Sequence, residues 1–94
     1  MPIPIFRAWR VSRINGNAQE VEVACLFPIP GGGDPALRYL LSFVEKKGKL
    51  KITSKKFFNE FGTTVLYDGL DFSVPNSVYN PMARMARAIL FERR

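Results

Sequence analysis

Histidine is absent from this sequence, and cysteine occurs once, at Cys25. Without histidine, the chain lacks the commonest general base, the commonest zinc ligand and any Ser-His or Cys-His nucleophile pair. A single cysteine excludes both an internal disulfide and a metal cluster built from cysteines. We therefore expect a protein that is not an enzyme and that uses no metal or small-molecule cofactor.

Long apolar runs are absent too. No stretch approaches the roughly 20 apolar residues that a membrane-spanning helix needs. The first ten residues, MPIPIFRAWR, contain two prolines and no continuous apolar segment, which is not typical of a signal peptide. We expect the protein to act in the cytoplasm where it is made (the host cytoplasm if a virus encodes it), without contact with a membrane.

Composition is otherwise ordinary for one folded domain. The 94 residues are 47% hydrophobic and 23% charged, which predicts a single globular domain over residues 1–94. Fourteen lysines and arginines against eight acidic residues give a net charge of +6. Such an excess indicates either an anionic partner or simply a surface that keeps the protein in solution.

Two N-terminal segments predict a β-hairpin. Residues 3–14 are rich in β-branched and aromatic side chains, and Asn15-Gly16-Asn17 is a strong turn signal before the second segment, residues 18–27. In the second segment apolar side chains alternate with others, and one face collects Val21, Val23, Cys25 and Phe27.

The register of this hairpin depends on the length of its loop. A two-residue Asn-Gly loop places Trp9 opposite Glu22 and mixes the faces, whereas a three-residue loop places Trp9 opposite Val23 and Ile5 opposite Phe27. Since a one-residue slip moves every side chain to the other face, we favour the three-residue loop. It predicts that Trp9 is buried. Cys25, on the valine face, is predicted to be a buried small apolar residue and not a nucleophile.

A helix is predicted after the glycine-rich connector at residues 28–33. A phosphate-binding loop is rejected there, because the Lys-Ser/Thr ending is missing and Asp34 would repel a phosphate. Asp34-Pro35 is typical of a helix start, and Gly48 of a helix end. Between them, apolar residues recur at helical spacing at Ala36, Leu37, Leu40, Leu41 and Val44.

The second half of the chain mixes strands and helices. We predict a strand at 49–53 and a short helix at 55–61, with a strand that continues through residue 58 as the competing interpretation. Strands at 64–67 and 70–74 flank Asp68-Gly69, a favoured hairpin turn. Asn80-Pro81 then predicts the start of the last helix.

The predicted order is ββαβαββα. This order is typical of an α+β domain with helices packed on one face of an antiparallel sheet. We predict a core of Trp9, Val21, Val23, Leu37, Leu40, Leu41, Val44, Phe61, Ile89 and Leu90.

The densest positive charge lies between Lys46 and Lys56, in the segment KKGKLKITSKK. Six of these eleven residues are lysine and none is acidic. Charge runs are often only a solvated face, but on the predicted strand Leu50 and Ile52 would point inward and leave lysines outward. We therefore predict a surface that binds phosphates, formed by Lys46, Lys47, Lys49, Lys51, Lys55 and Lys56.

Arginines form two further candidate surfaces. Arg84 and Arg87 are three residues apart, so they share one face of the last helix and could contact nucleic acid or an acidic protein. Arginines at 7, 10 and 13 surround Trp9 in a pattern that resembles a stacking platform for unpaired bases. The predicted register places Trp9 in the core, and we therefore favour a structural role for it.

Carboxylates give no clear catalytic or metal-binding pattern. Glu60, Asp68 and Asp71 are the only plausible cluster, and their spacing matches no known ligand set. Asp68 is also the residue that its predicted turn requires.

We expect a non-enzymatic basic protein that binds nucleic acid or a nucleoprotein complex, mainly through phosphates. The alternative is a small inhibitor or accessory subunit that docks on an acidic protein surface, a class common among virus-encoded inhibitors of host machinery. A small nuclease or toxin that uses only Lys, Arg and Tyr is a third, weaker alternative.

Overall fold

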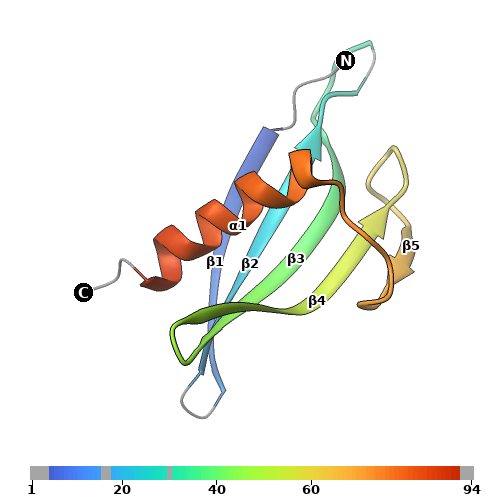
Figure 1. Ribbon diagram of the computed structural model, residues 1–94. Coiled ribbons are helices and arrows are strands. Elements are labelled where there is room, and N and C mark those ends of the chain that lie inside the picture. The colour runs from blue at the N-terminus through green and yellow to red at the C-terminus, as the bar shows by residue number, and fades with distance from the viewer. Residues whose placement is uncertain (1–4, 16–17, 30, 92–94) are drawn as a thin grey trace.

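Five strands and one helix make up the fold of the protein in a computed structural model, in which the backbone is described for residues 5–15, 18–29 and 31–91 and the side chains for 20–29 and 31–91 (Figure 1). The strands form one antiparallel sheet in sequence order, and the helix lies across one face of it. The elements are β1 Ile5–Asn15, β2 Ala18–Phe27, β3 Ala36–Lys46, β4 Lys49–Phe58, β5 Val65–Asp68 and α1 Asn76–Phe91.

The predicted α+β class and the antiparallel sheet are confirmed, whereas the order ββαβαββα is wrong. In the part of the chain that the structure describes, all five strands precede a single C-terminal helix. Each strand pairs with the next one along the chain, so the sheet is a simple meander whose edges are β1 and β5.

The predicted helix between Asp34 and Gly48 is the largest error, because this segment is β3, the central strand. Phe43 and Val44, on opposite faces of the strand, are both buried. Apolar side chains on both faces produce a continuous apolar run, and its spacing also satisfies a helical pattern. The segment is a strand because β2 and β4 form backbone hydrogen bonds with it on both sides.

Gly48 does mark a break, but it lies in a turn between two strands and not at the end of a helix. Lys46 lies opposite Lys49, and the two residues between them, Lys47 and Gly48, have φ values of 53° and 77°. Two successive positive φ angles match the tight turn whose twist suits a hairpin. The backbone N–H of Gly48 also donates to Glu45 Oε2 at 2.7 Å, which fixes the turn.

The strand predicted at 49–53 is confirmed, and it continues to Phe58, as in the competing interpretation. The short helix at 55–61 is therefore wrong: Phe57 lies opposite Tyr39 on β3, with ring centroids 5.1 Å apart. β5 broadly confirms the strand predicted at 64–67. It pairs with the end of β4, and 70–74 forms no strand, so the Asp68-Gly69 hairpin is wrong.

The N-terminal hairpin is confirmed, but its predicted register is wrong. An irregularity in β1 between Trp9 and Arg13 shifts the pairing, so that Trp9 lies opposite Glu22 and Ile5 opposite Leu26. A bulge adds residues to one strand only, and hydrophobic alternation alone does not reveal it. The burial of Trp9 lies outside the described side chains.

Helix α1 begins at Asn76 and not at the predicted Asn80. The N–H groups of Val78 and Tyr79 donate to the Pro75 carbonyl at 2.9 and 2.8 Å. Pro81 lies inside the helix, where it removes one backbone hydrogen bond. Val78 is buried against the sheet, and this packing favours the longer helix.

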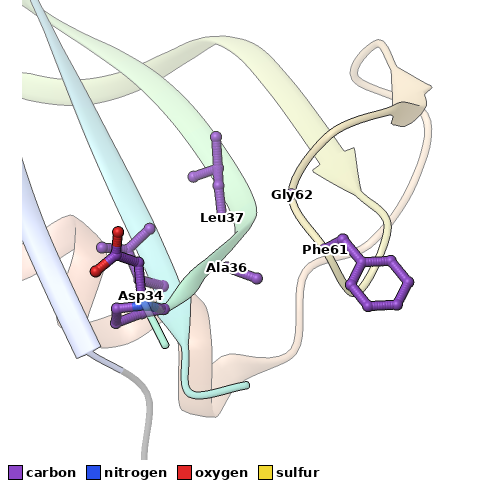
Figure 2. A pocket seen from close by; sticks show the side chains of 7 residues that line it. Asp34, Ala36, Leu37, Phe61 and Gly62 are labelled. Atoms are coloured by element: carbon purple, nitrogen blue, oxygen red, sulfur yellow. The ribbon is translucent and has the colours of Figure 1, made fainter. Parts of the chain in front are cut away.

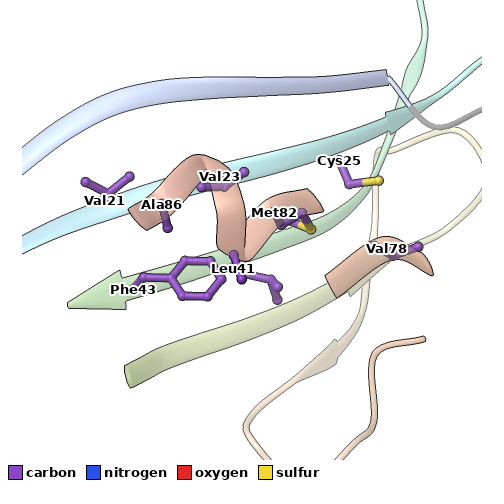
Figure 3. Packing of buried hydrophobic residues seen from close by; sticks show 9 residues of the cluster. Val21, Val23, Cys25, Leu41, Phe43, Val78, Met82 and Ala86 are labelled. Atoms are coloured by element: carbon purple, nitrogen blue, oxygen red, sulfur yellow. The ribbon is translucent and has the colours of Figure 1, made fainter. Parts of the chain in front are cut away.

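The core lies between α1 and the adjacent face of the sheet (Figure 3). Of the predicted core, Val21, Val23, Leu41 and Val44 are buried, and Ile89 and Leu90 are half-buried against the same cluster. Leu37 and Leu40 are half-buried, whereas Phe61 is exposed, so its assignment to the core is wrong. Cys25 is buried and unpaired, as predicted. The buried cluster comprises Val21, Val23, Cys25, Leu41, Phe43, Val78, Met82, Ala83 and Ala86.

Within the described residues, no helix combines the length and the apolar character needed to cross a membrane.

Candidate functional site

Four of the predicted lysines meet at the β3–β4 hairpin. Lys46, Lys47, Lys49 and Lys51 are all exposed and line a hollow of about 800 Å³. We call this feature the lysine hollow. Lys46 and Lys49 are directly opposite each other on the two strands. Like charges in this position destabilise a sheet by a fraction of a kcal/mol, so an anion bound here would relieve a repulsion that is built into the hairpin.

The alternation of β4 explains why these lysines face solvent. Leu50 and Ile52 are half-buried and pack against the core cluster under α1, as the sequence predicted. Because side chains of a strand alternate between its faces, Lys49 and Lys51 are directed to the opposite side of the sheet. The hydrophobic core thus fixes the direction of the positive charge.

Two carboxylates, one in this hairpin and one on the neighbouring strand β2, accept hydrogen bonds from it. Glu45 accepts from the Gly48 N–H, and Glu20 Oε2 accepts from Thr53 Oγ1 at 2.6 Å. The first bond holds the turn and the second joins β2 to β4. Both acidic side chains therefore contribute to the shape of the hairpin, while the described lining of the hollow consists of lysine.

Lys55 and Lys56 are placed elsewhere. Lys55 Nζ donates to the Phe72 carbonyl and lies 5.3 Å from the centroid of the Phe72 ring. This contact ties the segment that leads to α1 onto β4, which is a structural role. Lys56 is half-buried between Leu40 and Asp68 in the strand pairing. The lysine run of the sequence is therefore divided into a hairpin group and a structural group.

Arg84 and Arg87 are exposed on α1. The buried residues of this helix are Val78, Met82, Ala83 and Ala86, so the two arginines are on its solvent side. They do not contribute to the lysine hollow. The side chains of the arginines at 7, 10 and 13 lie outside the described residues.

Arg38 on β3 is a charged residue that the sequence did not single out. Its guanidinium carbon lies 5.1 Å from the ring centroid of Phe57 and 5.9 Å from that of Phe27, within range for cation–π attraction. Its Nε atom is buried and has no hydrogen-bond partner among the residues that the structure describes. These contacts of Arg38 form because β2, β3 and β4 are paired in the sheet. No local pattern in the sequence predicts that pairing.

Burial governs the titration of two groups close to Arg38. It raises the pKa of the Cys25 thiol to about 12, and the nearby positive charge of Arg38 lowers it by a smaller amount. Burial likewise raises the pKa of the Tyr39 hydroxyl. A thiol in this state is protonated at neutral pH, so Cys25 has little of the thiolate character that a nucleophile needs.

Glu60, Asp68 and Asp71 are exposed. Across the described side chains, no group of three or more carboxylate, histidine or cysteine residues is placed to hold a metal ion.

A second surface, which we call the apolar end, lies at the far end of β4 from the lysine hollow (Figure 1). No pattern in the sequence indicated this surface. Its five residues are large and apolar, yet each is between 45% and 61% exposed. They are Phe61, Val65, Leu66, Tyr67 and Leu70.

The loop at 59–64 presents Phe61 at this end. Asn59 Oδ1 accepts from the N–H groups of Phe61 and Thr63 at 3.0 and 3.1 Å, which fixes the loop. A pocket of about 450 Å³ lies between this loop and the start of β3. In Figure 2 the Phe61 ring projects outward from the loop, and Asp34 lies on the other side of the pocket.

Comparison of the chain with protein-family models, with curated proteins and with solved structures gave no match.

Proposed function

We propose that this protein binds the phosphate backbone of nucleic acid through the lysine hollow, without catalysing a reaction. One observation carries the proposal: four exposed lysines from two adjacent strands and their turn line a single hollow. Lysine ammonium groups on flexible stems suit phosphates as point charges. The net charge of +6 adds a long-range attraction for a polyanion.

Binding of this kind carries little sequence information. Phosphate contacts set position and affinity, whereas base contacts set specificity. The described lining holds no aromatic residue on which a base could stack and no arginine that could bind guanine in a bidentate manner. We expect dissociation constants of about 1–100 μM at physiological salt, the range of non-specific binding.

Salt dependence tests the proposal directly. Each phosphate contact contributes about 0.7–0.9 to the slope of log affinity against log salt concentration. Lysine-to-alanine replacement at 46, 47, 49 and 51 should reduce the slope by up to about 3.6 and weaken binding nearly equally for all sequences. The measurement is fluorescence anisotropy with labelled single- and double-stranded RNA and DNA oligonucleotides over a salt series.

A matched pair of double variants separates a site from a general charge effect. Lys49→Ala with Lys51→Ala removes two charges from the hollow, and Arg84→Ala with Arg87→Ala removes two from α1. All four side chains are exposed, and circular dichroism checks that each variant is folded. The lysine pair should cost clearly more affinity than the arginine pair. Equal losses would show that net charge alone is responsible, and no binding by the unmodified protein at low salt would refute the proposal.

A further inference from the structure

The tip of the β3–β4 hairpin is a two-stranded ribbon. The pairing of β3 with β2 ends at Val44, opposite Glu20, and the pairing of β4 with β5 begins only at Lys56, at the other end of the strand. Beyond Val44, within the described backbone, β3 and β4 pair only with each other, as far as Lys46 opposite Lys49. A two-residue turn closes the ribbon, so its tip is as narrow as two strands, whose backbones lie about 4.8 Å apart.

The lysines of this ribbon occupy one face and both of its strands. Lys46 and Lys49 are a directly opposite pair, one from each strand, and Lys51 lies on the same strand as Lys49, one alternation further along. Leu50 between them packs against the core, so the three lysines are directed away from α1. Lys47 in the turn adds a fourth cation. One face of the ribbon therefore presents positive charge on both sides of its axis.

Two described carboxylates border the ribbon, and neither lies at the tip of the lysine face. Glu45 alternates with Lys46 and so points to the other face, where its Oε2 atom accepts from the Gly48 N–H at 2.7 Å. Glu20 does share the lysine face, but it belongs to β2 and its Oε2 atom accepts from Thr53 Oγ1 at 2.6 Å. A polyanion is therefore attracted most strongly at the tip and at the free edge of β4.

The shape of the tip discriminates between polyanions of similar charge. The major groove of B-form DNA is about 12 Å wide and admits a two-stranded β-ribbon. The major groove of A-form RNA is deep and narrow, and protein side chains cannot read it. Single strands are held to a large extent by bases that stack on aromatic rings, whereas the described lining of the hollow consists of lysine.

We propose that the lysine hollow selects double-stranded B-form DNA, with the tip of the β3–β4 hairpin in the major groove. Lys46 and Lys49 contact phosphates on the two sides of the groove, and Lys47 and Lys51 add contacts before and after this pair. Because phosphates carry no sequence information, the selection is for the form of the duplex and not for its sequence. The inference rests on the proposed function, since it names the polyanion that the same lysines bind.

Competition at one salt concentration tests the choice of polyanion. A labelled DNA duplex is displaced from the protein by unlabelled duplex DNA, duplex RNA or single-stranded DNA of the same sequence and length, and fluorescence anisotropy follows the displacement. Both duplexes are dense polyanions, so charge alone predicts similar affinities for them. We expect duplex RNA and single-stranded DNA to bind at least tenfold more weakly than duplex DNA. Equal affinity for the two duplexes would overturn the inference, and the proposed function would stand if lysine replacement still weakened binding.

Modified DNA tests the groove without any change to the protein. Glucosylated 5-hydroxymethylcytosine places bulky uncharged groups in the major groove, whereas netropsin occupies the minor groove of A·T-rich duplexes. The glucosylated duplex should bind at least tenfold more weakly, and saturating netropsin should change the affinity less than threefold. The reverse result would place the protein in the minor groove and overturn the inference.

A variant of unchanged charge tests the narrow tip. Insertion of Gly-Ser-Gly-Ser between Lys47 and Gly48 keeps every lysine but replaces the two-residue turn with a broad loop. The affinity for single-stranded DNA should stay within about twofold, while the preference for duplex DNA should disappear; an unchanged preference would overturn the inference. Circular dichroism checks the fold, and the modified duplexes decide if the variant does not fold. No binding to any nucleic acid at low salt would refute the proposed function and this inference together.

Discussion

Replacement of Gly62 by alanine should destabilise the fold strongly, because two independent costs coincide at this position. Gly62 has a φ angle of 71°, in the left-handed region. A Cβ atom added there would lie 2.6 Å from the backbone nitrogen of Leu37 and 3.2 Å from its carbonyl oxygen. Leu37 belongs to β3, the central strand, so the loop at 59–64 would have to move away.

The two costs can be estimated separately. The left-handed backbone conformation is about 1–2 kcal/mol less favourable for a residue with a Cβ atom than for glycine. Forcing extra atoms into a close contact costs a further 1–3 kcal/mol or so. Gly62→Ala should therefore lower the free energy of unfolding by about 2–5 kcal/mol, a large part of the total for a domain of this size.

Gly48→Ala is the matched control. Gly48 has a nearly equal φ angle of 77°, but no atom of the described residues lies within 4 Å of its added Cβ. It should show only the conformational cost of about 1–2 kcal/mol. Urea denaturation followed by circular dichroism measures both variants, and unchanged m-values would confirm that the same transition is compared. Equal losses for the two variants would refute the close approach of the 59–64 loop to β3.

Two further predictions concern the core. Met82 is fully buried between α1 and the sheet. Met82→Ala should therefore lower the free energy of unfolding, measured by urea denaturation, by about 2–5 kcal/mol. A decrease of less than about 1 kcal/mol would argue against this packing. The raised pKa of Cys25, about 12 against an ordinary 9.0, means that the unfolded chain releases this proton first as pH rises. Stability should therefore fall between about pH 9 and 12, less steeply in Cys25→Ala, and thiol reagents should label the native protein far more slowly than the urea-unfolded chain.

Several features could be predicted from the sequence because they depend on residues close together in the chain. The alternation in 18–27 identifies a strand and correctly places Cys25 in the core, although Ala24 and Leu26 on its other face are buried too. Gly48 marks a chain reversal because few other residues accept its backbone angle. The alternation of Leu50 and Ile52 with lysines correctly predicts which side chains of β4 point inward. Each of these depends only on neighbours along the chain.

The type and limits of other elements depend on neighbours in space. Asn80-Pro81 resembles a helix start, yet Val78 packs in the core and extends α1 toward the N-terminus. The register shift in β1 between Trp9 and Arg13 has no local signal, although the rejected two-residue loop also placed Trp9 opposite Glu22. The fate of the lysines also depends on neighbours in space. Lys55 binds the Phe72 carbonyl while the hairpin lysines remain exposed, and the lysine run in the sequence does not predict this difference.

The sequence by itself determined the broad class of the protein: an α+β chain with excess positive charge, no histidine and one buried cysteine. Only the tertiary structure decided that 36–46 is a central strand, because its apolar residues fit a helix equally well until β2 and β4 satisfy its backbone on both sides. The same meander leaves β5 without an outer neighbour. It thereby exposes Leu66 and Tyr67, which in sequence are indistinguishable from core residues.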